Sequence, residues 1–421
     1  MTPRIAAAVD IDQDVQAARS AARGIVATAN SLRTAGAAAL VERARKVAAV
    51  AAEHAGAVDG DSRFPHEAIA AARAERLLGL AVPRELGGED ADIADIVDVC
   101  YVLGRACAST AMIYAMHQTK VACLVRHGRA SLWYQLLLRR LANEQLLFAS
   151  STTEGQSGGD LRNSAAPIVR NGARIALERQ ATVISYGQAA DAIVTTARRS
   201  ADAAGSDQVL VTFLKQDYRL EPLLGWDAFG MRGTCSEGFN LVAAGTSEQI
   251  VPVSYDRIHA QTMMPVAHLL WSAAWTGIAT AAVERARSFV RKAAQRGGGT
   301  LPPAAAHLTR ANAGLRTLRG LIASSLQRYE AAAADPAVLE SIDFQTGMNL
   351  LKVNASELAV SAVMSAMQTC GLSGYRNDGE FSIGRHLRDI LSSPIMISND
   401  RILANIAAAT LLGGAPDSLS G

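Results

Sequence analysis

Two histidines lie in apolar surroundings where an imidazole could act as a general base. His117 stands in the segment YAMHQTK, and His268 stands in PVAHLLW. Histidine is the usual general base near neutral pH. A histidine with apolar neighbours is also often a packed residue of the core or of a pocket wall, so both roles stay open. No HExxH spacing occurs, and the sequence therefore predicts no metal site of that kind.

The segment GQSGG (155–159) matches the G-x-S-x-G pattern of a nucleophile elbow. That elbow needs a strand before the serine and a helix directly after it. The residues that follow, DLRNSAAPIV, contain turn formers and then strand formers. This context favours a glycine-rich loop, whose backbone N–H groups can face an anionic or polar ligand.

The segment IGRHLRDILSSPIMISND (383–400) begins with the charged residues Arg385, Arg388 and Asp389. The next eight residues, Ile390 to Ile397, include no ionisable side chain. The segment therefore starts like an active-site helix but lacks an acid or base where chemistry would be expected.

The elements that would position these residues fall into three zones. Residues 1–145 are rich in alanine with helical periodicity, and residues 146–258 contain short β-branched runs with a type I′ hairpin signal at Asn171-Gly172. Residues 259–421 return to helical patterns, which we expect near 265–296, 303–334, 337–371 and 385–412. Helices, strands and helices in this order predict a segregated α+β fold with domains 1–145, 146–258 and 259–421.

The composition narrows the class of protein. The 421 residues carry a formal net charge of +2 without a dense basic patch, which argues against nucleic-acid binding. The five cysteines are odd in number and lie mostly in apolar runs, as is typical of buried thiols in a reducing compartment. No G-x-G-x-x-G or Walker-type loop occurs, and no uncharged apolar run approaches a membrane span. We therefore expect a cytoplasmic protein that binds neither a membrane nor a metal.

Six short motifs, in order along roughly residues 60–412, resemble those of the acyl-CoA dehydrogenase superfamily. They are AVPRELGGED, STTEGQSGGD (151–160), VISYGQAAD (183–191), WDAFGMRGTCSEGF, QTCGLSGY (368–375) and RHLRD. The resemblance implies an N-terminal helical domain, a central β domain and a C-terminal four-helix bundle. It also implies FAD bound between the β domain and the bundle.

The resemblance assigns roles to individual positions. Thr153 and Gly158 would hold the flavin, and the Ser185 hydroxyl would donate to the edge of its ring. Gln368 and Gly371 would reach the FAD of a partner subunit in a homotetramer or homodimer, and Asn399 would contact the cofactor. The arginine motif of the family is not clean, because Arg291 and Arg296 stand at shifted positions.

The resemblance also locates a missing base. Ile397 stands where most members carry the glutamate that removes the α-proton of an acyl thioester, and Ala267 stands at the alternative glutamate position. An α-proton beside a thioester is very weakly acidic, so its removal needs an aligned base. The candidates are His268, His117 and Asp400, in that order.

Three functions remain compatible with these residues. The first is FAD-dependent oxidation of an acyl or aminoacyl thioester on CoA or a carrier protein, with a relocated base. Electrons would pass to an electron-transfer flavoprotein, a reductase or oxygen. The second is a flavin-dependent monooxygenase on the same fold, which needs no α-proton removal. The third is a non-catalytic flavin-binding or scaffold protein.

Overall fold

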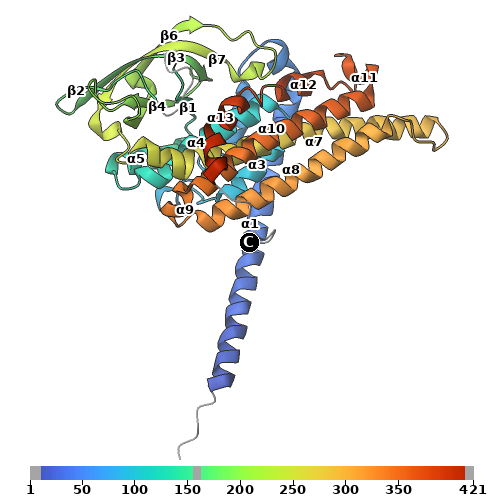
Figure 1. Ribbon diagram of the computed structural model, residues 1–421, viewed down its shortest axis with the longest axis horizontal. Coiled ribbons are helices and arrows are strands. Elements are labelled where there is room, and N and C mark those ends of the chain that lie inside the picture. The colour runs from blue at the N-terminus through green and yellow to red at the C-terminus, as the bar shows by residue number, and fades with distance from the viewer. Residues whose placement is uncertain (1–10, 155–162, 413–421) are drawn as a thin grey trace, which may run out of the picture. The chain divides into compact units, whose positions relative to one another are not determined.

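The computed structural model describes residues 11–154 and 163–412 (Figure 1). The chain divides into two compact units, residues 1–43 and residues 44–421. Helix α1 (Ile11–Gly60) supplies the described part of the first unit and continues into the second. The second unit contains every other element discussed below.

Four further helices precede the strands. They are α2 (His66–Ala74), α3 (Ile93–Gly104), α4 (Ala108–Gly128) and α5 (Leu132–Glu144). The Asp92 side chain caps α3 by accepting a hydrogen bond from the backbone N–H of Asp95. Helix α4 is buried along almost its whole length, and its buried residues include the polar His117, Gln118 and Lys120. The helical pattern predicted for this part of the chain is confirmed.

The strands form two sheets. The three-stranded sheet has the order β1 (Phe148–Ser151), β4 (Ala192–Arg198) and β5 (Gln208–Leu214). The four-stranded sheet has the order β2 (Val169–Asn171), β3 (Arg174–Ser185), β7 (Ser236–Thr246) and β6 (Tyr218–Leu224). Strands β4 and β5 are almost entirely buried, whereas β3 alternates exposed and buried residues and so keeps one open face.

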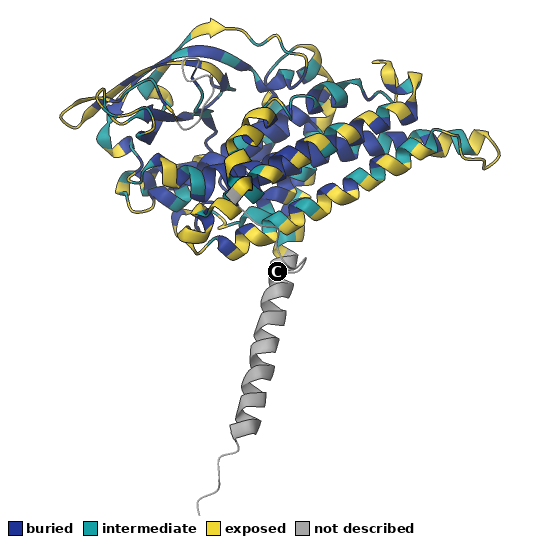
Figure 2. Cartoon of the chain, viewed as in Figure 1, coloured by how far each residue is buried: buried dark blue, intermediate teal, exposed yellow. Residues whose placement is uncertain are grey.

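The C-terminal helices begin with α6 (Tyr255–Ile258) and a π-helical turn (His259–Met263), which leads directly into α7. The remaining helices are α7 (Met264–Arg296), α8 (Ala305–Ala332), α9 (Pro336–Glu340), α10 (Ile342–Cys370), α11 (Leu372–Tyr375), α12 (Gly384–Ile390) and α13 (Asn399–Leu412). Helix α7 is the core helix of this group, and α8 exposes its outer face (Figure 2). Helices α7, α8, α10 and α13 provide the predicted four-helix bundle.

Two glycines let helix α3 approach helix α7 closely. A Cβ atom at Gly104 would lie 2.3 Å from the Ala274 carbonyl oxygen, and one at Gly277 would lie 2.4 Å from the Tyr101 carbonyl oxygen. Each distance is shorter than a Cβ atom tolerates. Helices α3 and α7 therefore pack with their backbones in direct contact, which fixes the position of α7.

The structure corrects two sequence expectations. Asn171 pairs with Arg174 across the hairpin, so Gly172 and Ala173 form the turn. Of these two, only Gly172 has a positive φ, and a type I′ turn needs two. The helix expected over 385–412 is broken between α12 and α13, where Pro394 lacks a backbone N–H and Ile397 has a φ of 51°.

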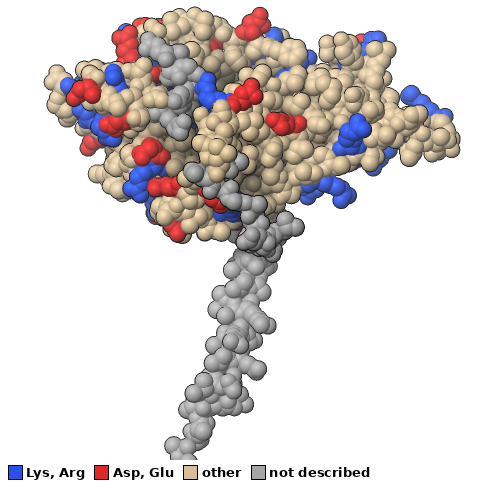
Figure 3. Space-filling view, in the orientation of Figure 1, with Lys and Arg blue, Asp and Glu red and all other residues tan. Residues whose placement is uncertain are grey.

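The surface and core agree with a folded globular chain. All five cysteines are free thiols, four of them buried. Residues 255–296 and 342–370 could span a membrane by length and composition, but 94% and 56% of their most apolar windows are buried, as in core helices. Acidic and basic side chains are interspersed on the face shown in Figure 3. Residues 11–154 and 163–412 contain no cluster of three metal-ligating side chains.

Candidate active site

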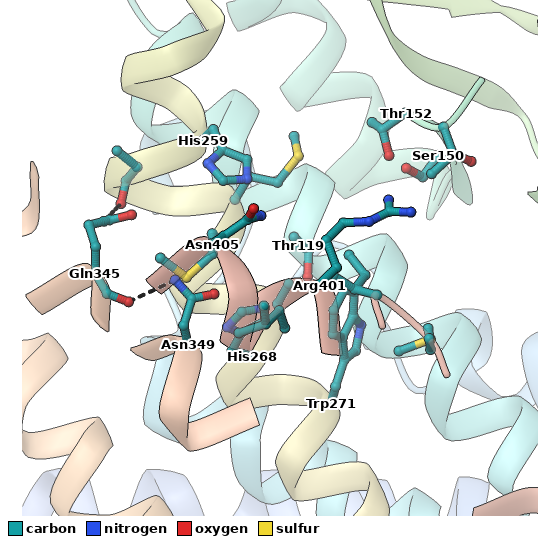
Figure 4. A pocket seen from close by; sticks show the side chains of 18 of the residues that line it. Thr119, Ser150, Thr152, His259, His268, Trp271, Gln345, Asn349, Arg401 and Asn405 are labelled. Carbon is teal, nitrogen blue, oxygen red and sulfur yellow. Dashed lines mark hydrogen bonds between the residues drawn. The ribbon is translucent and has the colours of Figure 1, made fainter. Parts of the chain in front are cut away.

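A cavity of about 580 Å³ lies between the strands and the C-terminal helices. One wall comes from the ends of β1 and β3, and the others come from α4, the π-helical turn, α7, α10 and α13. Figure 4 shows Ser150 and Thr152 on one side and His268 and Trp271 on the other, with Arg401 extending between them. Short π-helical segments are frequent at functional sites. The cavity therefore combines elements from both halves of the chain.

The strand wall carries two of the predicted cofactor residues, Thr153 and Ser185. Thr153 follows β1 and is held in place by its neighbour Glu154, which is buried. The Glu154 carboxylate lies 3.1 Å from the Arg179 guanidinium and accepts a hydrogen bond of 3.0 Å from the Ser164 hydroxyl. This buried ion pair connects the end of β1 to β3, so the two hydroxyl-bearing segments keep a defined separation.

A chain of hydroxyls determines how Ser185 can interact with a ligand. The Thr234 hydroxyl donates to the Met231 carbonyl at 2.8 Å, so in its 2.7 Å contact with Ser236 it must accept. Ser236 has then donated its only hydrogen and accepts from Ser185 at 2.8 Å. The Ser185 oxygen therefore offers lone pairs to the cavity. We expected the Ser185 hydroxyl to donate to the flavin ring, and that contact stays a prediction.

His268 lies on the helical wall, and its ring orientation is determined by one backbone contact. Nδ1 lies 2.9 Å from the Met348 carbonyl oxygen, which can only accept, so Nδ1 carries the proton. No described residue hydrogen-bonds to Nε2. Burial lowers the pKa of His268 to about 3, so the ring is neutral near pH 7. His268 therefore lines the cavity with a neutral ring whose Nε2 carries the lone pair.

The other two proposed bases do not line the cavity. His117 is fully buried, with Nε2 2.9 Å from the Leu78 carbonyl and Nδ1 accepting from the Phe148 N–H at 3.0 Å. Both ring nitrogens are therefore occupied by the backbone, and His117 is a core residue. Asp400 is exposed at the start of α13. Neither position can take a proton from a ligand in the cavity.

Ile397 lines the cavity with a strained backbone. Its φ of 51° is unusual for a β-branched side chain. The buried ammonium of Lys352 donates to the Ile397 carbonyl and to Asn399 Oδ1, both at 2.7 Å. The Asn399 amide also donates to the Ser356 hydroxyl at 3.0 Å. Asn399 thus stabilises the 397–399 turn through its hydrogen bonds to Lys352 and Ser356. It does not line the cavity.

The predicted intersubunit contacts lie elsewhere. Gln368 and Gly371 are exposed at the C-terminal end of α10 and do not line the cavity. Arg291 and Arg296 are exposed near the end of α7. Gly158 and the whole GQSGG segment fall outside the described residues. Among the described positions, one chain therefore brings together Thr153, Ser185, Ala267, His268 and Ile397 in the cavity.

Lys120 is a cavity residue that the sequence reasoning missed. It comes from α4, and only 5% of the side chain is exposed. Its ammonium lies 3.3 Å from Met263 Sδ, a weak acceptor. Desolvation lowers its pKa to about 8. The signal in the sequence was that Lys120 is the single Asp, Glu, Lys or Arg between Arg105 and Arg126.

The charged residues Arg388 and Asp389 of the RHLRD segment bind other parts of the same chain. Asp389 accepts a 2.7 Å hydrogen bond from the Met231 N–H, and Arg388 pairs with Asp59. These contacts connect α12 to the end of α1 and to the turn before β7. Asp59 and Arg388 line a second cavity of about 870 Å³, which shares no lining residue with the first. The ionic residues of α12 therefore act as a scaffold.

The residues of the first cavity fit the polar edge of a flavin ring. Thr153 and Ser185 provide hydroxyl oxygens from the strand wall. On the helical wall, Trp271 Nε1 is buried and has no hydrogen-bond partner among the described residues, so a ligand acceptor that reached it would satisfy it. A ring with carbonyl oxygens and ring nitrogens can satisfy both kinds of group.

Comparison with known families identifies both ends of the chain. Residues 34–144 match the acyl-CoA dehydrogenase N-terminal domain, and residues 259–412 match the acyl-CoA dehydrogenase C-terminal domain. The cyclohex-1-ene-1-carbonyl-CoA dehydrogenase of Syntrophus aciditrophicus is 25% identical over 365 residues. That alignment covers 84% of this chain and 84% of the relative.

Solved structures share the fold at low sequence identity. The FMN-bound dibenzothiophene monooxygenase TdsC of Paenibacillus sp. A11-2 superposes with a TM-score of 0.77 and 16% identity, covering 90% of this chain and 98% of that one. The prolyl acyl carrier protein oxidase AnaB gives a TM-score of 0.74 and 16% identity, covering 89% and 99%. The predicted α+β architecture is confirmed.

Proposed function

Because the chain belongs to the acyl-CoA dehydrogenase superfamily, we propose that it is an FAD-dependent oxidoreductase that oxidises an acyl or aminoacyl thioester. The thioester is carried by CoA or by a carrier protein. The observation that carries the proposal is the placement of the His268 imidazole in the same cavity as Thr153 and Ser185. The likeness to a CoA-thioester dehydrogenase and to an acyl carrier protein oxidase supports the substrate class.

His268 removes the α-proton of the thioester in this proposal. The Met348 carbonyl holds the Nδ1 proton, and Nε2 takes the proton that leaves the α-carbon. A bound flavin would supply the acceptor for the hydride that leaves the β-carbon. The Ser185 oxygen and the Trp271 N–H orient polar groups of the ring or of the thioester. The net change is a carbon–carbon double bond in the substrate and a two-electron reduction of the cofactor.

The low pKa of His268 is compatible with this role. A base must be unprotonated before it reacts, and burial ensures this at neutral pH. The proton affinity of Nε2 rises once negative charge develops on the substrate beside it, because opposite charges attract strongly in a dry site. Removal of water by the substrate is thus part of the mechanism.

One observation favours the monooxygenase alternative. Neither Ile397 nor Ala267 is acidic, and Asp256 and Glu340, the carboxylates that line the cavity, are exposed. An enzyme that activates oxygen on reduced flavin needs no such acid, and the likeness to TdsC agrees with this chemistry. Oxygen would then be consumed together with electrons from a reductase.

The test separates these functions through the flavin spectrum. The purified protein should be yellow and release FAD, identified by chromatography of the denatured supernatant against FMN. Anaerobic mixing with a panel of acyl thioesters should bleach the flavin if the chain is a dehydrogenase. No bleaching, with oxygen-dependent product formation when a reductase is added, would establish the monooxygenase. A protein that neither carries nor takes up flavin would leave the scaffold function.

A paired substitution tests the base. In His268→Gln the side-chain amide can still donate to the Met348 carbonyl but cannot take a proton. We expect bleaching to slow by about 10² to 10⁴-fold with flavin still bound. His259→Gln, at a half-buried residue of the same cavity, is the control and should retain most of the rate. Equal rates in wild type and His268→Gln would remove His268 as the base.

The proposed enzyme is a homo-oligomer. Gln368 and Gly371 are exposed, as required of residues that contact the flavin of a second subunit. Gln368→Glu should weaken flavin retention without changing the fold of the subunit, and size-exclusion chromatography should give a dimer or tetramer. A monomer that retains flavin fully would contradict this assignment.

A further inference from the structure

The cavity contains a buried positive charge, Lys120, that forms no ion pair with an acid among the described residues. Lys120, the adjacent Thr119 and its contact Met263 are all buried, whereas Asp256 and Glu340 are exposed. The cavity therefore has an exposed side, with Asp256, Glu340 and Arg401, and a buried side, called here its closed end, where Lys120 lies.

The surroundings of Lys120 do not neutralise its charge. Its single hydrogen-bond contact among the described residues is with Met263 Sδ at 3.3 Å. The Thr119 hydroxyl is already used, because it donates to the Ala115 carbonyl at 2.8 Å. Glu340 accepts a hydrogen bond of 2.6 Å from Gln261 and lies 3.5 Å from Arg257. Glu340 thus interacts with Gln261 and Arg257.

An unpaired buried ammonium is costly to the free protein. Removing a charge from water without an opposite charge or a set of hydrogen bonds carries a penalty of several kcal/mol. A fatty acyl chain in this cavity would remove the remaining water and increase that penalty. A ligand with a negative group at this end would offset it. The geometry therefore selects the charge of the ligand.

We propose that Lys120 binds a carboxylate at the far end of the acyl group, so that the substrate is the monothioester of a dicarboxylic acid. This inference rests on the proposed function above. A carboxylate matches one ammonium in charge, and a charge-assisted hydrogen bond of this kind is about twice as strong as a neutral one. A phosphate group would bring nearly two charges to a pocket end with one buried cation.

The first experiment compares thioesters that differ only at the far end. We would prepare pantetheine thioesters, since pantetheine is the part common to CoA and carrier proteins. Glutaryl and pentanoyl thioesters form one pair, and adipoyl and hexanoyl thioesters form another. Wild type should oxidise the carboxylate-bearing member of a pair with the higher kcat/KM. In Lys120→Met this preference should fall by about 10- to 150-fold, as for loss of a hydrogen bond to a charged group.

The controls separate this inference from the proposed function. Lys46→Met removes an exposed lysine that pairs with Glu75, and it should keep the wild-type preference. If no thioester of either kind bleaches the flavin, the proposed function fails. If the neutral thioesters react as well as the carboxylate-bearing ones, the inference about Lys120 fails while the function stands. An unchanged preference in Lys120→Met would also overturn it.

A binding measurement needs no turnover. Pantetheine thioethers with a terminal carboxylate lack the thioester carbonyl and have no acidic α-proton. Titration calorimetry should show that wild type binds them more tightly than the methyl-ended thioethers. Lys120→Met should lose the difference, and Lys46→Met should keep it. Equal affinities of wild type for the two thioethers would refute carboxylate binding by Lys120.

Discussion

Replacing Lys120 with methionine should stabilise the ligand-free protein. Methionine has a similar length and no charge, and it can pack against Met263 in the buried site. Burial lowers the pKa of Lys120 from 10.5 to about 8. At roughly 1.4 kcal/mol per pKa unit, holding the ammonium in the folded state costs about 3 kcal/mol. Lys120→Met should recover a gain of this order near pH 7.

The stability gained by Lys120→Met should depend on pH, because the pKa of Lys120 is lower in the folded state than in the unfolded state. Between pH 8 and 10.5 the unfolded lysine holds a proton that the folded lysine has lost, so the wild-type free energy of unfolding rises with pH through this window. The penalty is complete below the folded-state pKa. The advantage of Lys120→Met should therefore be greatest below pH 8 and fade toward pH 10.5. The neighbouring Cys123 thiol, buried and with its pKa raised to about 12, stays protonated throughout.

Lys352 is the matched control. Its pKa is also lowered to about 8 by burial, but its ammonium donates to the Ile397 carbonyl and to Asn399 Oδ1. Lys352→Met would remove the ammonium that donates to these two oxygens, and the loss of a donor to a buried acceptor costs about 1–3 kcal/mol. It should therefore destabilise the protein. Two buried lysines with similar pKa values should thus give opposite results.

Urea unfolding at pH 7 and at higher pH, followed by circular dichroism, measures both variants. The protein should be kept at one concentration with the same flavin content, because a bound ligand or partner subunit shifts the apparent stability. A Lys120→Met variant that is less stable than wild type at pH 7 would refute the reasoning. So would a gain that does not change between pH 7 and 10.

Two further predictions concern buried charges outside the cavity. Arg179→Met should lower the free energy of unfolding by about 3–5 kcal/mol, because it removes the guanidinium that balances the charge of the buried Glu154 carboxylate; adding Glu154→Gln should recover part of the loss in thermal unfolding. Burial raises the pKa of Asp389 to about 6, so the folded carboxyl binds a proton that the unfolded one has lost between pH 4 and 6. Wild type should lose stability relative to Asp389→Asn as the pH rises through this range, because asparagine keeps an acceptor for the Met231 N–H; parallel pH profiles would contradict this.

Several elements could be predicted from local pattern alone. The buried strands β4 and β5 appeared as β-branched runs, and α7 appeared as a long apolar helix ended by glycines. These features depend on residues close in the sequence. The order of helices, strands and helices then determined the α+β class, and the ordered motifs identified the superfamily.

The roles of single side chains could not be predicted in this way. His117 and His268 have similar apolar neighbours in the sequence, yet both nitrogens of His117 bond to the backbone and Nε2 of His268 does not. The difference comes from β1 and α10, which lie far away in the chain. The direction of the Ser185 hydrogen bond likewise depends on Ser236 and Thr234 in and before β7.

The sequence by itself determined the elements, their order and the absence of a carboxylate at Ile397, because these follow from residue type and short-range spacing. Only the tertiary structure decided which polar groups meet in the cavity. Burial and hydrogen-bond partners arise when α4, α7 and α10 pack together, and they set the charge state of each group. Lys120 illustrates this, since its unpaired charge at the closed end of the cavity exists only once these helices have removed it from water.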